Sequence, residues 1–232
     1  MDQLSYRVSS SKAGASPTPA TIASWAKEPA ALYTMGAATG TFARSGGYST
    51  MRVFLDFEAS SLSDDGYPIE VGWVFEDGRS ESHLIKPAPQ WVDWDPGAEA
   101  LHRISRATLE ADGAPHDVVA HHLLSTLSEH VVYASAPSWD GKWLSVLFRA
   151  AGMPRHAMRL KDCDEAYVEA AVEVLSASVP PAKVKTLAAE IVGRALAMAL
   201  GCSVRHRALA DAEQERQIWL EVRRLAYEQC GS

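Results

Sequence analysis

Three apolar segments follow one another closely in this chain, and they constrain its fold more than any other feature. They span residues 51–59, 69–77 and 82–87, and the first two are rich in β-branched and aromatic residues. Short turns that carry Gly66 and Gly78 separate them. Segments of this length and composition between glycine turns are typical of consecutive β-strands. The sequence therefore predicts that the sheet begins with three strands joined by short turns.

The remainder of the chain alternates between the helical and the strand pattern. Apolar residues recur at helical spacing in 116–130 and 138–152, and a short strand pattern at 131–135 lies between them. One helix is expected to begin after residues 94–110, and further helical segments follow residues 159–166. Strands first, and then alternation of helix and strand, predict an α/β domain built on a mixed sheet.

The chain divides near residue 50. Residues 1–50 are rich in Ser, Ala, Gly, Thr and Pro and show no sustained periodicity. Such a segment cannot bury enough apolar surface to fold alone, so we expect a weakly ordered, low-complexity N-terminal extension. The folded domain is expected to occupy residues 51–232. Because Met51 stands directly before the first strand, the extension could even precede the natural start of the protein.

Composition excludes several classes of protein. The chain has 232 residues, 47% of them hydrophobic, which is enough for one full core. No run of about 18 apolar residues predicts a membrane span, and the N-terminus lacks the features of a secretory signal. Cys163, Cys202 and Cys230 are far apart, which argues against a disulfide framework or a zinc site and indicates a cytoplasmic protein. The net charge of −7 argues against wrapping of long nucleic acid.

Two carboxylates stand at the end of the first predicted strand. Asp56 and Glu58 are two residues apart, so the period of a strand directs both side chains to one face. Like charges this close repel one another, and burial would add to the cost. Two interpretations remain open at this point. The pair either lies in water at a strand end or forms half of a metal site.

Two further carboxylates lie on apolar helical faces. Asp140 shares a face with Trp143 and Leu147, and Asp211 shares one with Val222. Each Asp could be a first-turn residue that offsets a helix dipole. Together with the strand pair, however, they make four carboxylates directed at the protein interior. Hard divalent cations would relieve the repulsion among them.

These positions resemble a known family. The Asp56-x-Glu58 pair, Asp140 at a helix start and the segment His-Arg-Ala-Leu-Ala-Asp-Ala at 206–212 are similar to the DEDDh branch of the DnaQ-like 3′–5′ exonucleases. His206 five residues before Asp211 distinguishes this branch from the one that carries tyrosine. The resemblance extends over residues 51 to about 220 and implies a ribonuclease H-like mixed sheet flanked by helices.

The resemblance also implies a reaction. Asp56, Glu58, Asp140 and Asp211 would bind two Mg²⁺ ions, with Mn²⁺ as a substitute, and His206 would accept a proton from the attacking water. Five residues of helix turn the chain by about 500°, so His206 is expected in the loop before the last helix rather than on the face of Asp211. The expected products are nucleoside 5′-monophosphates, released from the 3′ end of single-stranded DNA or RNA.

Substrate contacts are implied in the same way. Leu62 matches the family leucine that wedges between the last two bases, and His102 lies in a segment that the family places near the bound nucleotide. The chain departs from the family at residues 59–61, where Ala-Ser-Ser replaces Thr-Thr-Gly, at Arg103 in place of Gly and at Trp139 in place of Phe. These positions line the nucleotide pocket, so the choice between DNA, RNA and short oligonucleotides stays open.

A rival class is a nucleic-acid-binding or regulatory module with little catalysis, which would have lost a metal ligand or the histidine. None is lost here. A homodimer also stays open. The other histidines are expected on a surface helix or without suitable neighbours: His83, His116, His121, His122, His130 and His156.

Overall fold

A computed structural model describes residues 50–199 and 206–231. The predicted extension, apart from Thr50, lies outside the described residues. No helix among the described residues has both the length and the apolar character that crossing a membrane requires.

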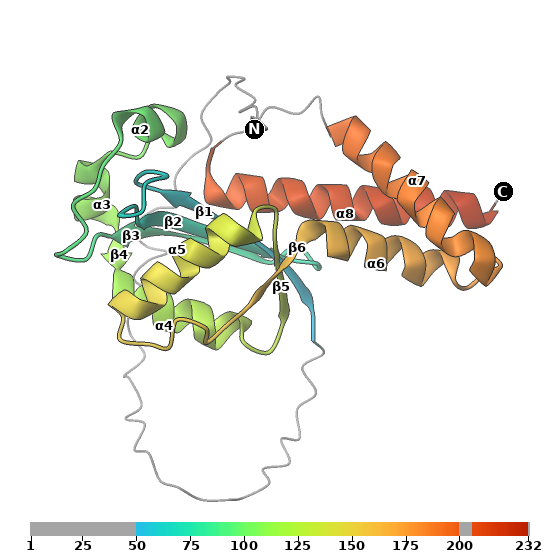
Figure 1. Cartoon of the computed structure of the whole chain (residues 1–232), viewed down its shortest axis with the longest axis horizontal. Coiled ribbons are helices and arrows are strands. Elements are labelled where there is room, and N and C mark those ends of the chain that lie inside the picture. The colour runs from blue at the N-terminus through green and yellow to red at the C-terminus, as the bar shows by residue number, and fades with distance from the viewer. Residues whose placement is uncertain (1–49, 200–205, 232) are drawn as a thin grey trace, which may run out of the picture. The chain divides into compact units, whose positions relative to one another are not determined.

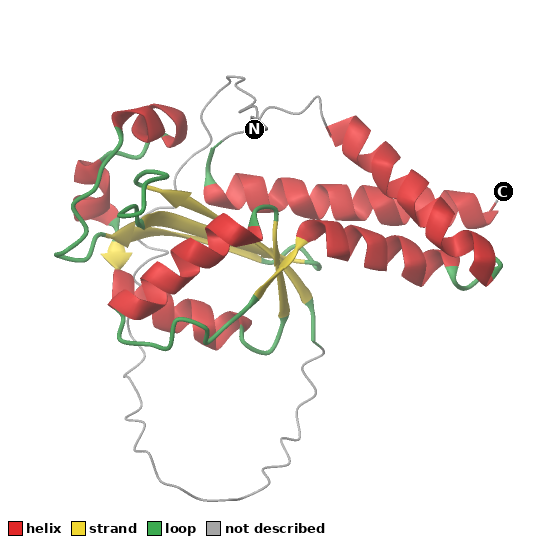
Figure 2. Cartoon of the chain, in the orientation of Figure 1, coloured by secondary structure: helices red, strands yellow, loops and turns green. Residues whose placement is uncertain are grey.

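Six strands form one sheet in the order β4-β3-β2-β1-β5-β6 (Figures 1 and 2). The strands are β1 (Arg52–Ala59), β2 (Pro68–Phe75), β3 (Ser80–Lys86), β4 (Ala114–Pro115), β5 (Val131–Ala134) and β6 (Leu160–Asp162). The first three pair antiparallel, whereas β1 and β5, and β5 and β6, pair parallel. The predicted mixed sheet with three leading strands is confirmed.

Seven helices in the described residues accompany the sheet. They are α2 (Pro96–His102), α3 (Arg106–Asp112), α4 (His116–Leu127), α5 (Pro137–Ala150), α6 (Cys163–Leu175), α7 (Pro181–Ala199) and α8 (Ala208–Gly231). The predicted α/β class, with helices flanking a mixed sheet, is therefore confirmed.

One prediction about the helices was wrong. Residues 94–110 were expected to precede a helix, but they contain α2 and most of α3. Asp95 caps α2 by accepting a hydrogen bond from the Gly97 N–H, and Pro96 occupies the first helical position, where its missing N–H costs nothing. Arg103 ends the helix in the left-handed region at φ 59°. Two helices of seven residues are too short to show a clear period in sequence.

The two faces of the sheet carry different helices. The strand register pairs Asp56 with Gly72 and Leu55 with Trp73, so neighbouring pairs point to opposite faces. The start of α8 lies on the Gly72 face: a Cβ at Gly72 would come within 2.3 Å of the Leu209 backbone nitrogen. Only glycine allows α8 to approach the strand this closely.

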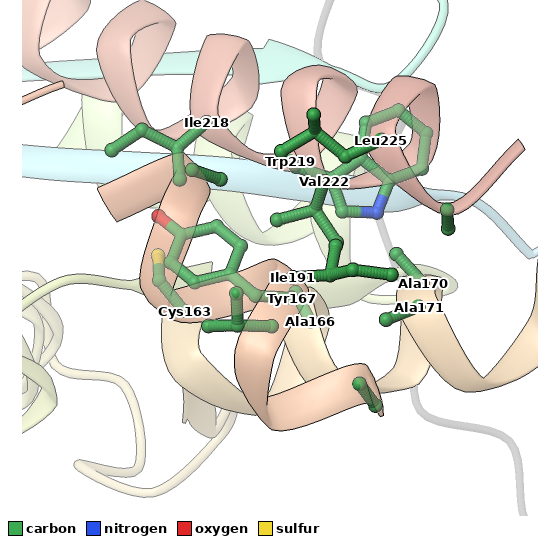
Figure 3. Close-up of a cluster of buried hydrophobic side chains, with 14 of the residues drawn as sticks. Cys163, Ala166, Tyr167, Ala170, Ala171, Ile191, Ile218, Trp219, Val222 and Leu225 are labelled. Carbon is green, nitrogen blue, oxygen red and sulfur yellow. The ribbon is translucent and has the colours of Figure 1, made fainter. Parts of the chain in front are cut away.

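The Gly72 face is also the main apolar core. Phe54 and Val74 of the sheet pack with buried side chains of α6, α7 and α8. Figure 3 shows Tyr167 of α6 and Ile191 of α7 gathered with Trp219 of α8. The opposite face is covered by α4 and α5, where the buried Trp73 ring packs against His122 of α4. Helices therefore cover both faces of the sheet at β1.

Candidate active site

Three of the predicted carboxylates meet where β1 ends. Asp56 and Glu58 lie on β1 and face α8, and Asp211 lies in the first turn of α8. Each offers an oxygen that lies within 4.8 Å of the other two. Residues separated by more than 150 positions in the chain are thus brought together at one face of the sheet.

The fourth predicted carboxylate, Asp140, approaches from α5. It lies in the first turn of that helix and is only 3% exposed. Its Oδ1 accepts a hydrogen bond from the Phe57 N–H at 3.3 Å, so it sits against the strand residue between Asp56 and Glu58. Its Oδ2 is buried and has no hydrogen-bond partner among the described residues. Asp140 and Asp211 thus agree with both interpretations of the sequence. Each lies in the first turn of its helix, and each is also directed at the protein interior.

Burial and mutual repulsion oppose ionisation of this cluster. Burial is the largest cause that raises the pKa of Asp56 well above its ordinary range, and the charges of Asp140 and Glu58 raise it further. Burial and the charge of Asp211 raise the pKa of Glu58 to about 8. Burial also raises the pKa of Asp140 to about 7, although backbone hydrogen bonds partly offset it. The close oxygens and the unpartnered Asp140 Oδ2 fit a hard divalent cation, which prefers oxygen ligands and would stabilise the ionised form.

A fifth carboxylate, which sequence reasoning missed, adjoins the cluster. Glu215 lies one helical turn after Asp211 on α8, and the Tyr167 hydroxyl donates a hydrogen bond to it. Its burial, together with the charge of Asp211, raises its pKa despite that hydrogen bond. The spacing of four residues from Asp211 was the available signal, since it places both side chains on one helical face.

His206 lies outside α8, two residues before its first residue, as the five-residue spacing predicted. Its φ of 48° puts it in the left-handed region, which is uncommon for a residue other than glycine. Such strain persists only where the surrounding structure imposes it, and it is found often at functional sites.

An ion pair between a buried glutamate and a partly exposed arginine joins the start of α8 to the sheet. Glu70 of β2 is 1% exposed, and Arg207 donates to it through Nη2 at 2.6 Å and through Nε at 3.0 Å. The Ala208 N–H also donates to Glu70, at 3.1 Å. Because His206 precedes Arg207 and Asp211 follows it by one turn, this pair helps to set the position of both.

The two residues implied in substrate contact differ in exposure. His102, at the end of α2, is 3% exposed; its Nδ1 accepts from the Ile104 N–H at 3.0 Å. Its Nε2 is buried and has no hydrogen-bond partner among the described residues. Burial, as the main cause, lowers the pKa of His102 to about 4, so the ring is neutral at pH 7. Leu62 is half-exposed, as a residue that contacts a ligand must be.

One aromatic ring also reaches the surface beside Asp140. Trp139 is 40% exposed and stacks on Trp143 with 5.8 Å between ring centroids. The Lys142 ammonium lies 5.2 Å from the Trp139 ring and 4.5 Å from the Trp143 ring. An exposed aromatic ring next to a cation is suited to stacking on bases and attracting phosphates.

No model of a known protein family matches the sequence, and no curated protein matches it. Solved structures of E. coli exonuclease I do match. A zinc-bound complex of that enzyme with single-stranded DNA aligns with 76% of this chain at 17% identity and a TM-score of 0.56. A complex with a dA16 oligonucleotide aligns with 78% at 15% identity and a TM-score of 0.54, as does the apo enzyme. This chain covers 41–44% of the length of those chains. The likeness shows that the chain has the ribonuclease H-like fold of E. coli exonuclease I.

Proposed function

We propose that this chain is a metal-dependent exonuclease that hydrolyses single-stranded DNA or RNA from the 3′ end and releases nucleoside 5′-monophosphates. The observation that carries the proposal is the convergence of Asp56, Glu58, Asp140 and Asp211 beside the end of β1, on the fold of E. coli exonuclease I. Among the matching exonuclease I structures are complexes with single-stranded DNA and with a dA16 oligonucleotide, which supports a single-stranded substrate.

The four carboxylates would hold two Mg²⁺ ions, or Mn²⁺ in their place. Bound there, the ions would lower the pKa of the attacking water and neutralise charge that develops on the phosphate. Without bound cations, repulsion within the cluster disfavours the state in which all four carboxylates are ionised. Glu215 adds a fifth carboxylate one helical turn after Asp211, and it accepts a hydrogen bond from the Tyr167 hydroxyl.

His206 would act as the general base. It precedes α8, whose first turn carries Asp211, and an imidazole has an ordinary pKa near 6.5 that suits proton transfer at neutral pH. Its left-handed backbone is of a kind that clusters at functional sites, which supports this role. This assignment corresponds to the histidine branch of the DnaQ-like exonucleases.

The substrate would lie across Leu62, His102 and Trp139. Leu62 would insert between the last two bases, and Trp139 would stack on a base, with Lys142 beside it to attract a phosphate. His102 is neutral and has a buried Nε2 without a partner among the described residues, so it would direct a hydrogen bond at the bound nucleotide.

Degradation of matched substrates tests the proposal. Single-stranded DNA, RNA and dinucleotides, each with a free or a blocked 3′ end, would be incubated with the full-length protein in Mg²⁺ or in EDTA. We expect 5′-monophosphates from free 3′ ends in Mg²⁺ alone. Asp140→Asn should abolish release, whereas Asp112→Asn, which alters an exposed carboxylate at the end of α3, should leave the rate unchanged. Binding of the oligonucleotides without any release would favour a nucleic-acid-binding module instead.

A further inference from the structure

A second group of metal-binding side chains lies between β3 and α4. Glu81 and His83 are two residues apart on β3, and His122 comes from α4. The Oε2 atom of Glu81 lies 2.6 Å from His122 Nε2 and 3.2 Å from His83 Nε2. One ligand atom from each of the three residues lies within 4.8 Å of a ligand atom of the other two. His83 was expected to lack suitable neighbours, and His122 was expected on a surface helix. The expectation for His83 was wrong, because Glu81 of its own strand and His122 of α4 both lie beside it.

This group is separate from the candidate active site. Glu81 pairs with Trp73 across the sheet, and Trp73 pairs with Leu55, so these side chains share one face. Asp56 pairs with Gly72 and therefore points to the other face, where α8 lies. The sheet itself stands between the two groups.

Aromatic packing holds the two imidazoles in place. The fully buried Trp73 ring lies 5.1 Å from the His83 ring and 5.8 Å from the His122 ring, measured between centroids. The two imidazoles lie 5.2 Å apart at 74° to one another. Rings fixed in this way lose little freedom when they bind a common atom, which favours binding.

We propose that Glu81, His83 and His122 form a binding site for a borderline divalent metal, Zn²⁺ above all. Two imidazoles and one carboxylate form a ligand set that Zn²⁺ prefers, whereas Mg²⁺ prefers oxygen ligands alone. At ligand distances of about 2.0–2.1 Å, the atoms around a tetrahedral Zn²⁺ lie about 3.3 Å apart. The separations of 2.6 and 3.2 Å at Glu81 require only small side-chain movements to reach that geometry.

A water would supply the fourth ligand. The side chains of His83, His122 and Glu81 are 13%, 26% and 39% exposed, so the group is partly accessible to solvent. A metal bound there would join the middle of β3 to α4 and would stabilise the folded chain by mass action, because the unfolded chain does not hold the three ligands together.

A cobalt titration tests the site separately from catalysis. Full-length protein would be titrated with Co²⁺ in excess Mg²⁺, which on the proposed function would occupy the carboxylate cluster. The visible absorption of four-coordinate Co²⁺ would follow the binding. We expect one equivalent of Co²⁺, displaced by Zn²⁺. His83→Ala and His122→Ala should each weaken binding at least about 10-fold, since even outer-shell partners of a metal are worth about 10–100-fold.

His121→Ala is the matched control. His121 neighbours His122 on α4, but it is exposed and its Nδ1 contacts the Asp117 carbonyl of its own helix. Its removal should leave Co²⁺ affinity unchanged, as should Asp56→Asn on the other face. Zn²⁺ should raise the melting temperature of the control and of the wild type, but not that of His122→Ala.

Three results would overturn the site. The first is that no Co²⁺ binds in excess Mg²⁺. The second is that His83→Ala and His122→Ala bind Co²⁺ with wild-type affinity, and the third is that His121→Ala loses as much affinity as they do. Should the alanine variants not fold by far-UV circular dichroism, Glu81→Gln replaces them. This variant keeps the shape of the side chain and removes its charge. Wild-type affinity in Glu81→Gln would then overturn the proposal, and a loss of about 10-fold or more would support it.

Discussion

Replacing Glu58 with glutamine should stabilise the metal-free protein. Glu58 faces Asp211 across the cluster, and glutamine keeps its size while removing its charge. Its pKa is raised from 4.5 to about 8, chiefly by burial and then by the charge of Asp211. Ionising Glu58 therefore costs free energy in the folded protein that it does not cost in the unfolded chain. Glutamine cannot ionise, so the substitution removes this cost.

The size of the effect follows from the pKa. The gap between 4.5 and about 8 corresponds to about 5 kcal/mol, at about 1.4 kcal/mol for each pKa unit. Glu58 is only partly buried, and the cluster can relax, so we expect about half of this, or about 2–3 kcal/mol, at pH 8. For a domain of this size that stabilisation raises the melting temperature by about 4–12 °C.

The sign of the pH dependence follows from the same values. Because the pKa of Glu58 is higher in the folded protein, its contribution to stability is complete below pH 4.5 and is lost as the pH rises to about 8. Wild type should therefore become less stable across that window. The difference between wild type and Glu58→Gln should be near zero at pH 4.5 and greatest at pH 8 or above.

Thermal unfolding in EDTA at pH 4.5, 6 and 8 measures this difference, with Glu129→Gln as a control for loss of an exposed carboxylate. Added Mg²⁺ should stabilise wild type more than Glu58→Gln. At pH 8 it should therefore remove or reverse the difference in melting temperature between the two proteins. The electrostatic reasoning fails if Glu58→Gln melts no higher than wild type in EDTA at pH 8, or if the gap does not change with pH.

Three other substitutions or truncations test separate parts of the structure. In Gly72→Ala the added Cβ would overlap the backbone of Leu209, so the start of α8 should be displaced and the rate of hydrolysis should fall at least about 10-fold. A wild-type rate with an unchanged fold would contradict the close approach of α8 to Gly72. His206→Ala should lower kcat by about 10²–10⁴-fold and remove the rise of kcat with pH, while calorimetry shows unchanged affinity for Mn²⁺. If the variant keeps the wild-type kcat and pH profile, His206 is not the base. A chain that begins at Met51 should keep its melting temperature and its rate, and a large loss of either would show that the preceding residues pack on the domain.

Local patterns in the sequence were enough to predict the class of fold. Strand-length apolar segments between glycine turns, followed by helical periods, indicated the mixed sheet and the covering helices. The two-residue period of β1 also placed Asp56 and Glu58 on one face, because side-chain direction in a strand is set by backbone geometry alone. The short helices α2 and α3 escaped detection, since seven residues give fewer than two full turns of pattern.

Only the tertiary structure decided which side chains meet across elements. The contact of Asp140 with the backbone of β1, and the hydrogen bond from Tyr167 of α6 to Glu215 of α8, depend on how the helices pack on the sheet and on one another. The group formed by Glu81, His83 and His122 likewise exists only because α4 crosses β3 at that point. A sequence shows the face on which each side chain lies, but not which face of another element it will meet. That is settled by packing, since it takes the summed burial of the whole core to bring such distant residues together.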